Sequence, residues 1–264
     1  KINFKINFQN PLSLADSLKI SGKSLEKSNN TEFFIALKLF KQDIKKIRYY
    51  NKYKNLCKQL ISNEKYIYFP LHFQPEATTY PYGNFYVDQI NAIKLLSECS
   101  DDETFIYVKE HPDTFNLSRF AWYRGMFSRD IQFYEEISKI NKVKFIDLKH
   151  DSTNLIKNSI LTSSITGTSA LQAVLEGKHA IVFGDCWYKF CEGIYNVASK
   201  NDLRSYFENK KFSKNIDKNK VSFFFQYLNH YSFEGSKSGI TNNDNFIDIA
   251  KKLSENVNEI LSLK

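Results

Sequence analysis

The chain has 264 residues, enough to bury a sizeable core in one large or two small domains. Hydrophobic residues make up 42% and charged residues 25%, which is the balance of an ordinary globular protein and not of a disordered or fibrous one. The net charge of +8 favours anionic partners such as lipid headgroups, nucleotides and charged sugars. Nucleic acid is the competing partner, but the lysines are spread along the chain and no zinc-finger, helix-turn-helix or RRM motif occurs, so we expect no nucleic-acid binding.

The cysteines and the apolar runs indicate the compartment. Four cysteines occur without a Cys-x-x-Cys pair or histidines at ligand spacing, which predicts neither a disulfide framework nor a zinc site and fits a reducing cytoplasm. No run approaches the roughly 18 apolar residues of a membrane span, and no signal peptide opens the chain. We therefore expect a cytoplasmic protein, peripheral on the inner face of the cell membrane. The first residue is Lys and not Met, which is compatible with a fragment of a longer protein.

The first predicted segment, residues 1–62, precedes the regular part of the chain. Residues 1–30 are polar with weak periodicity and predict a linker or loosely attached arm. Residues 31–62 have apolar residues at helical spacing and predict one long helix or two broken ones. We interpret the segment as a linker or as the remnant of an upstream domain.

Residues 63–200 are predicted to form a Rossmann-like domain. Short apolar runs bounded by turn residues alternate with helical patterns, an order typical of a doubly wound, mostly parallel α/β sheet. The predicted strands are 65–70, 104–110, 142–148, 160–166, 179–183 and 193–197. The predicted helices are 88–99, 119–140, 153–159 and 170–176.

The third predicted segment, residues 201–264, is helical. Residues 199–207 and 221–230 have helical patterns with a lysine-rich loop between them. Residues 245–263 form an amphipathic pattern of the kind that covers an apolar surface.

The most distinctive turn is Thr166-Gly167-Thr168-Ser169, which joins a predicted strand to a predicted helix. Such a turn presents hydroxyls, backbone N–H groups and the positive end of the helix dipole, and this combination suits a phosphate. The alternative is a plain helix N-cap, for which Ser and Thr are common.

A second motif, Lys109-Glu110-His111-Pro112, ends another predicted strand. An imidazole in this place can donate a hydrogen bond to a phosphate oxygen and carry charge near neutral pH. The alternative is a loop histidine that bonds to its own backbone, and Asp113 is interpreted as a turn residue.

Ligands of open parallel sheets bind beyond the carboxyl ends of the strands, so we expect further site residues in these loops. His72 and Gln74 follow the first strand and are either substrate contacts or surface residues, and Asp185 follows the fifth strand. Glu76 is a candidate base or sugar-hydroxyl ligand. Glu176, near the end of the helix after the Thr166 turn, is a ribose ligand or an exposed helix residue. Trp187 and Tyr188 are interpreted as packing residues more than as a sugar platform.

Other catalytic signatures are missing from the sequence. No Walker lysine motif, GxGxxG, HExxH or GxSxG occurs, and no pair among the five histidines has helical metal spacing. Kinase, hydrolase and metalloenzyme readings therefore lack support, and we predict no metal site.

Four segments together resemble a known family. They read FPLHFQPEATT, VKEHP, DS-x-x-LI-x-x-S and ITGTSALQAVLEGKHAIVFGDCWY, and the match around them covers about residues 66–197. They resemble bacterial capsule and surface-polysaccharide biosynthesis proteins, which are similar to GT-B glycosyltransferases that use CMP-sugars, namely Kdo transferases and bacterial sialyltransferases.

The resemblance implies a site and a role. In that family a His-Pro motif and a Ser/Thr-rich turn hold the CMP phosphate and nucleotide. The matching positions are His111 and Pro112 with Ser163, Ser164, Thr166, Thr168 and Ser169. The resemblance also implies that the Rossmann-like domain is the C-terminal half of a GT-B enzyme. Relatives have a second domain upstream that often supplies the base, and the residues before 63 are too few to form one. Glu76 is the candidate base within this chain.

The sequence thus predicts a metal-independent glycosyltransferase that needs no cofactor beyond its nucleotide-sugar donor, a CMP-linked sugar of the Kdo or sialic acid type. The acceptor would be a glycan or a lipid-linked sugar, and capsule-assembly proteins and an anionic membrane are expected partners. The alternatives are a UDP-sugar transferase or 2-epimerase on the same fold, and a non-catalytic polysaccharide-assembly module.

Overall fold

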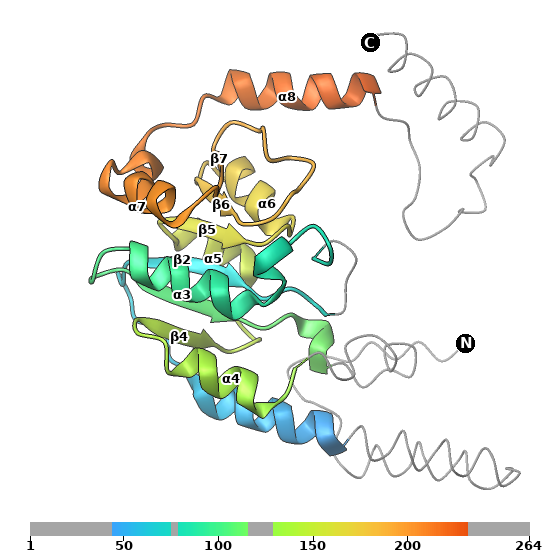
Figure 1. Ribbon diagram of the computed structural model, residues 1–264, viewed down its shortest axis with the longest axis vertical. Coiled ribbons are helices and arrows are strands. Elements are labelled where there is room, and N and C mark those ends of the chain that lie inside the picture. Colours follow the sequence, from blue (N-terminus) through green and yellow to red (C-terminus); the bar gives the residue numbers. More distant parts are fainter. Residues whose placement is uncertain (1–43, 75–78, 116–128, 232–264) are drawn as a thin grey trace, which may run out of the picture. The chain divides into compact units, whose positions relative to one another are not determined.

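The computed structural model describes residues 44–74, 79–115 and 129–231 (Figure 1). The predicted arm at 1–30 and the predicted helix at 245–263 lie outside these residues. The chain divides into two compact units, Lys1–Ile216 and Asp217–Lys264, which are described separately. The domain boundaries at 62 and 200 stay predictions.

The first unit is built on one parallel sheet. Within the described residues the sheet has seven strands in the order β1-β4-β3-β2-β5-β6-β7, and every neighbouring pair is parallel. The strands are β1 (Cys57–Lys58), β2 (Tyr66–Pro70), β3 (Phe105–Lys109), β4 (Val143–Ile146), β5 (Leu161–Ser164), β6 (Ala180–Val182) and β7 (Ile194–Asn196). From β4 to β7 this is the strand order of a Rossmann fold, with the chain reversing direction across the sheet between β2 and β5. The predicted doubly wound α/β fold is confirmed, and all six predicted strands are present.

Helices cover both faces of the sheet (Figure 1). The first unit contains α3 (Gln89–Cys99), α4 (Ile131–Ser138), α5 (Ser152–Asn158), α6 (Ser169–Leu175) and α7 (Lys200–Glu208), with short 3-10 helices η1 (Asn84–Val87), η2 (Pro112–Phe115) and η3 (Lys211–Ser213). α3 contacts α4 and α7 on one face, and α5 contacts α6 on the other. In the second unit α8 (Lys218–Tyr231) corresponds to the helix predicted at 221–230.

Short polar side chains set where the helices begin. Asp88, Asp151 and Ser199 each accept a hydrogen bond from a backbone N–H in the first turn of α3, α5 and α7. Asp130 does the same for α4 by accepting from the N–H of Phe133. The prediction of one helix over 119–140 is therefore wrong at its start in the described part, because the Asp130 cap begins α4 at residue 131.

The N-terminal segment contributes to the sheet, which the sequence did not indicate. Residues 44–56 are helical, but Cys57 and Lys58 leave the helix and pair with Phe145 and Ile146 of β4. Tyr53 is buried, and its hydroxyl donates to the carbonyl of Ile146 at 2.5 Å. The prediction of one long helix or two broken ones over 31–62 is therefore wrong from residue 57 onward.

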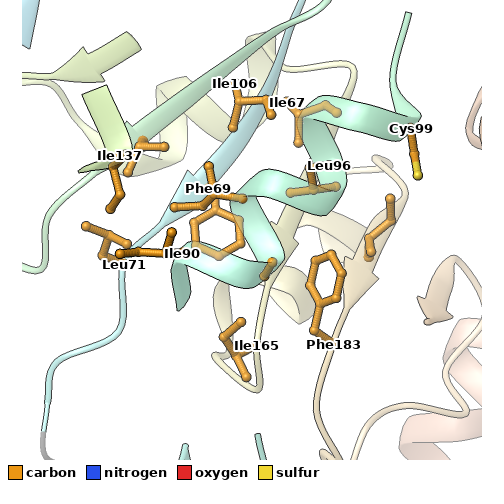
Figure 2. Close-up of a cluster of buried hydrophobic side chains, with 14 of the residues drawn as sticks. Ile67, Phe69, Leu71, Ile90, Leu96, Cys99, Ile106, Ile137, Ile165 and Phe183 are labelled. Atoms are coloured by element: carbon orange, nitrogen blue, oxygen red, sulfur yellow. The ribbon is translucent and has the colours of Figure 1, made fainter. Parts of the chain in front are cut away.

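The core lies between the sheet and the helices α3 and α4. Alternate residues of β2, Ile67 and Phe69, pack with Ile106 of β3 and Leu96 of α3, and all four are fully buried (Figure 2). Figure 2 also shows Ile165, which follows β5 and continues this cluster toward the carboxyl edge of the sheet. The turn at 166–169 therefore directly follows a residue that is packed in the core.

Candidate functional site

The site lies where the chain reverses across the sheet, beyond the neighbouring strands β2 and β5. Their register pairs Ile67 with Leu161 and Tyr68 with Thr162, so both strands end at the same edge. His72 lies two residues beyond β2, and Thr166 lies two residues beyond β5. Ligands of doubly wound sheets bind in this crevice.

His72 joins the two strand ends. Its Nε2 lies 2.9 Å from the hydroxyl oxygen of Ser164 and accepts from the backbone N–H of Ile165 at 3.2 Å. The N–H of Thr166 approaches the same atom at 3.4 Å. An Nε2 that accepts these bonds leaves the ring proton on Nδ1. The interpretation of His72 as a surface residue is wrong, since the residue is only 6% exposed.

The environment keeps His72 neutral. Burial, reinforced by the positive charge of Arg129 and by His111, lowers the pKa of His72 to about 4. At neutral pH the imidazole is therefore an acceptor for the turn and not a cation for a phosphate. A role in proton transfer is unfavourable because the lone pair of Nε2 already accepts hydrogen bonds from the turn.

The turn at 166–169 is tightly held. The N–H of Gly167 donates to the Ser164 hydroxyl oxygen at 3.0 Å, and the buried Tyr188 hydroxyl donates to the carbonyl of Gly167. A Cβ at Gly167 would lie 2.8 Å from that Ser164 oxygen and 2.9 Å from Cε1 of His72, so only glycine fits. Thr168 occupies the N-cap position of α6, but its side chain makes no capping bond. The hydroxyl of Thr168 therefore does not cap α6.

A buried carboxylate holds the His111 loop. Glu110 is 1% exposed, and its Oε1 accepts from the backbone N–H of His111 at 2.6 Å and from the hydroxyl of Thr114 at 3.1 Å. The same atom forms an ion pair with Arg129, and Oε2 accepts from the Tyr134 hydroxyl at 2.7 Å. Burial and the neighbouring carboxylate raise the pKa of Tyr134, so this phenol stays a donor. The loop after β3 is thus fixed by one fully bonded side chain.

His111 itself is accessible. Its side chain is 40% exposed, its ring lies 5.6 Å from that of Phe73, and its Nδ1 accepts from the N–H of Asp113 at 3.2 Å. The contact with the N–H of Asp113 is the bond expected if His111 were a loop histidine bonded to its own backbone. It leaves Nε2 as the ring atom that can reach a ligand. Asp113 belongs to η2, which begins at Pro112.

Two of the predicted site residues have a buried polar atom without a hydrogen-bond partner among the described residues. The atoms are Nε2 of Gln74, two residues beyond His72, and the hydroxyl oxygen of Ser163 in β5. Unpaired buried donors are uncommon, and a ligand is one way to satisfy them. The side-chain amide of Gln74 thus has a donor available for a ligand, and its role as a substrate contact stays a prediction.

Other predicted site residues lie apart from this crevice. The Lys109 ammonium contacts the carbonyl of His150 at 2.5 Å and the hydroxyl of Ser152 at 3.0 Å, and burial lowers its pKa. Glu176 ends α6 at the end opposite to the turn, where it is 3.5 Å from Lys157. The structure thus does not bring Glu176 to the turn.

Asp185 and Glu76 complete the predicted set. Asp185 is exposed beside the crevice, its N–H donates to the carbonyl of Tyr82 at 2.8 Å, and its carboxylate pairs with Lys189. Glu76 lies outside the described residues. The packing interpretation is confirmed for Tyr188, which is fully buried, but it does not describe Trp187, which is 59% exposed.

Sequence reasoning missed Arg129. It is buried at the start of the segment that leads into α4, with one arm on Glu110 and the other on the carbonyl of His72. No local signal marks it, because its partners are 19 and 57 residues away.

The crevice lies in a part of the chain that matches a family of known proteins. The family described as "Capsule polysaccharide biosynthesis protein" matches residues 27–228, which is more than half of the chain. The chain belongs to the capsule polysaccharide biosynthesis protein family. Its matched region includes every described residue of the crevice. No curated protein sequence matches the chain.

Solved structures similar to this capsule biosynthesis protein include two transferases and an epimerase. The KpsC β-Kdo 2,7-transferase of Thermosulfurimonas dismutans is 14% identical over 76% of this chain and 60% of its own, with a TM-score of 0.40. The UDP-GlcNAc 2-epimerase of Methanocaldococcus jannaschii is 15% identical over 71% of this chain and 51% of its own, with a TM-score of 0.41. The KpsC β-Kdo 2,4-transferase of T. dismutans is 11% identical over 87% and 70%, with a TM-score of 0.38. The chain thus spans less than two thirds of the first two.

Two searches of the described residues bear on metals and membranes. No group of three or more His, Cys, Asp or Glu side chains in that part of the capsule biosynthesis protein could hold a metal ion. None of the helices described is both long and apolar enough to cross a membrane.

Proposed function

We propose that this protein is a glycosyltransferase of capsule or surface polysaccharide synthesis. It takes a sugar from a nucleotide donor, CMP-linked and of the Kdo or sialic acid type, and transfers it to a glycan or glycolipid. The observation that carries the proposal is the His72-braced turn beyond β5, at the switch point of a Rossmann-like sheet. Membership of the capsule family supports it.

Transfer requires that the bond between the anomeric carbon and the donor phosphate breaks as an acceptor oxygen attacks. The phosphate leaves with the bonding electrons, and the acceptor proton passes to a base. Under this proposal Nε2 of His111 and the hydroxyls of Thr166, Thr168 and Ser169 bind the leaving phosphate, with Ser163 as a further nucleotide ligand. Donors fixed in advance stabilise developing charge without a metal or other cofactor.

The base and the sugar contacts are further parts of the proposal. Glu76 is the proposed base within this chain, and an upstream half of a GT-B enzyme is the alternative source. Gln74, with its unpartnered amide nitrogen, and Asp185 are proposed to contact the donor sugar or the acceptor.

Two other functions make different predictions. A UDP-sugar transferase or 2-epimerase would use the same crevice but prefer UDP. A non-catalytic assembly module would bind polymer or capsule-assembly proteins and show no nucleotide preference. The glycine fit at residue 167 favours a ligand site over such a module, because the close packing there maintains a defined turn.

The deciding experiment is nucleotide binding by calorimetry, with CMP, UDP, GDP and ADP compared on one preparation. We expect CMP to bind best and His111→Ala to weaken it about tenfold or more, since a hydrogen bond to a charged group contributes about 1.5–3 kcal/mol. The matched control is His179→Ala, because His179 precedes β6 at the opposite edge of the sheet and contacts the carbonyl of Lys214. Equal binding of all four nucleotides, or none, would contradict the proposal.

We also propose that the protein works in the cytoplasm at the inner face of the membrane. The net charge of +8 supports attraction to anionic lipid and to a lipid-linked acceptor. Sedimentation with anionic vesicles but not with zwitterionic vesicles, reversed by salt, is the expected result.

A further inference from the structure

We propose that Arg129 is a positioning residue that couples the His111 loop to the turn at 166–169. The inference rests on the proposed function, because it assigns these two loops to one ligand. It concerns the buried chain of contacts from Glu110 through Arg129 to His72, which we call the relay.

The first half of the relay joins Arg129 to the His111 loop. The guanidinium and the Glu110 carboxylate form an ion pair in which the side chains are 3% and 0% exposed. The carboxylate oxygen that Arg129 contacts is the one that accepts from the N–H of His111. A displacement of Arg129 therefore changes the acceptor that fixes the His111 backbone.

The second half joins Arg129 to the turn. Its other terminal nitrogen donates to the carbonyl of His72, and the Nε2 of that histidine accepts from Ile165 and lies against Ser164. The ends of β2, β3 and β5 are thus connected through one guanidinium. The planar fork of arginine suits this task, since a lysine ammonium offers no rigid pair of arms.

The relay is poorly explained by stability alone. A buried ion pair gains little over well-packed apolar residues, because desolvation offsets the attraction between the charges. Nε of Arg129 is also buried without a hydrogen-bond partner among the described residues. The strand ends are already packed by core residues such as Phe69 and Val108. What apolar residues would not provide is a fixed distance between the two loops.

The opposite edge of the sheet offers a matched comparison. There Glu64 pairs with Lys144 and accepts from the Tyr107 hydroxyl, as Glu110 pairs with Arg129 and accepts from Tyr134. Glu64 precedes β2, so this second cluster lies at the amino edge, away from both loops. It tests the loss of an ion pair without a change at the site.

The experiment compares Arg129→Met, Arg129→Lys and Lys144→Met in the full chain. The readouts are the thermal midpoint, the Kd for CMP, and the imidazole nitrogen resonances of 15N-histidine-labelled protein. Arg129→Lys is included in case Arg129→Met does not fold, because it keeps the charge beside Glu110 and removes only the second arm.

We expect both Arg129 variants to weaken CMP binding at least tenfold and to shift the resonances of His72 and His111 together. Lys144→Met should leave the Kd within twofold and both resonances in place, even where its thermal midpoint falls equally. The proposal is overturned if Arg129→Lys binds CMP within twofold of wild type with unmoved resonances, or if Lys144→Met weakens binding as much.

The resonances also separate this proposal from the proposed function. If the wild-type protein binds none of the four nucleotides, the proposed function fails and the relay is judged by the resonances alone. Joint movement of His72 and His111 in an Arg129 variant then supports the relay, and movement of only one of them overturns it.

Discussion

His72 and Ser164 are 92 residues apart in the chain, and the imidazole Nε2 of the first lies 2.9 Å from the hydroxyl oxygen of the second. This contact connects the ends of the two strands between which the sheet reverses. The same Ser164 hydroxyl oxygen accepts from the backbone N–H of Gly167, so the contact with His72 also connects to the turn at 166–169. Its energetic weight can be measured, because β5 carries a neighbouring serine with no such contact.

Ser164→Ala should lower the free energy of unfolding by about 1–3 kcal/mol, because it leaves the N–H of Gly167 and one bond of His72 unsatisfied. The control is Ser163→Ala, whose hydroxyl is buried without a partner among the described residues. It should change stability by less than about 0.5 kcal/mol or raise it. Urea unfolding measures both, and equal losses would show that the contact with His72 contributes nothing particular.

Gly167→Ala should weaken nucleotide binding and destabilise the protein by about 1–3 kcal/mol, because the new Cβ would overlap Ser164 and His72. Gly177→Asn is the control at the other end of α6. Gly177 has a φ of +76° and open space around its Cβ position, and asparagine tolerates that conformation. Binding measured by calorimetry should change only in the first variant, and an unaltered Kd for Gly167→Ala would contradict the turn as a ligand site.

Stability should fall on mild acidification because of His72. Its pKa is about 4 in the folded protein and near 6.5 when unfolded, so between these values the unfolded chain binds a proton that the folded protein does not. The free energy of unfolding therefore decreases as pH falls from about 6.5 to 4, by about 3 kcal/mol in total. Urea midpoints across this range should fall less steeply in His72→Gln than in wild type. His179→Gln should keep the wild-type slope.

Tyr188→Phe should cost about 1 kcal/mol of stability, since it removes the donor to the Gly167 carbonyl while keeping the ring. Tyr206→Phe is the matched control, because that hydroxyl is also buried but has no partner among the described residues. It should be neutral or stabilising. An equal or larger loss for Tyr206→Phe would mean that losing a buried hydroxyl, and not losing the bond to the turn, explains the effect at Tyr188.

The sequence predicted the central strands well because their signal is local. The run at 65–70 and the run at 104–110 are continuous apolar stretches ended by Pro70 and by His111-Pro112, and both are buried strands within one residue of the expected ends. β1 could not be found in this way. Two residues at the end of a helical pattern become a strand only because β4, 88 residues later, offers a free edge.

The site was predicted in part for the same reason. The turn at 166–169 and His111 can be recognised in the sequence from their residue types and from their positions directly after predicted strands. Arg129 and Glu110 instead read as ordinary polar residues, and their burial depends on partners that the fold brings together. His72 was placed near the ligand, but its low pKa and its bond to Ser164 follow from burial, which spacing does not reveal.

The two outermost strands of the sheet bear on how the protein behaves at high concentration. β1 is two residues long and β7 is three, and each has a paired neighbour on one side only, whereas the five strands between them are paired on both sides. A long unpaired edge strand can pair with a strand of another chain. A short edge strand that contains a lysine, such as β1 with Lys58, disfavours such pairing. Within the described residues the sheet thus ends in borders too short to seed stacking of one molecule on the next.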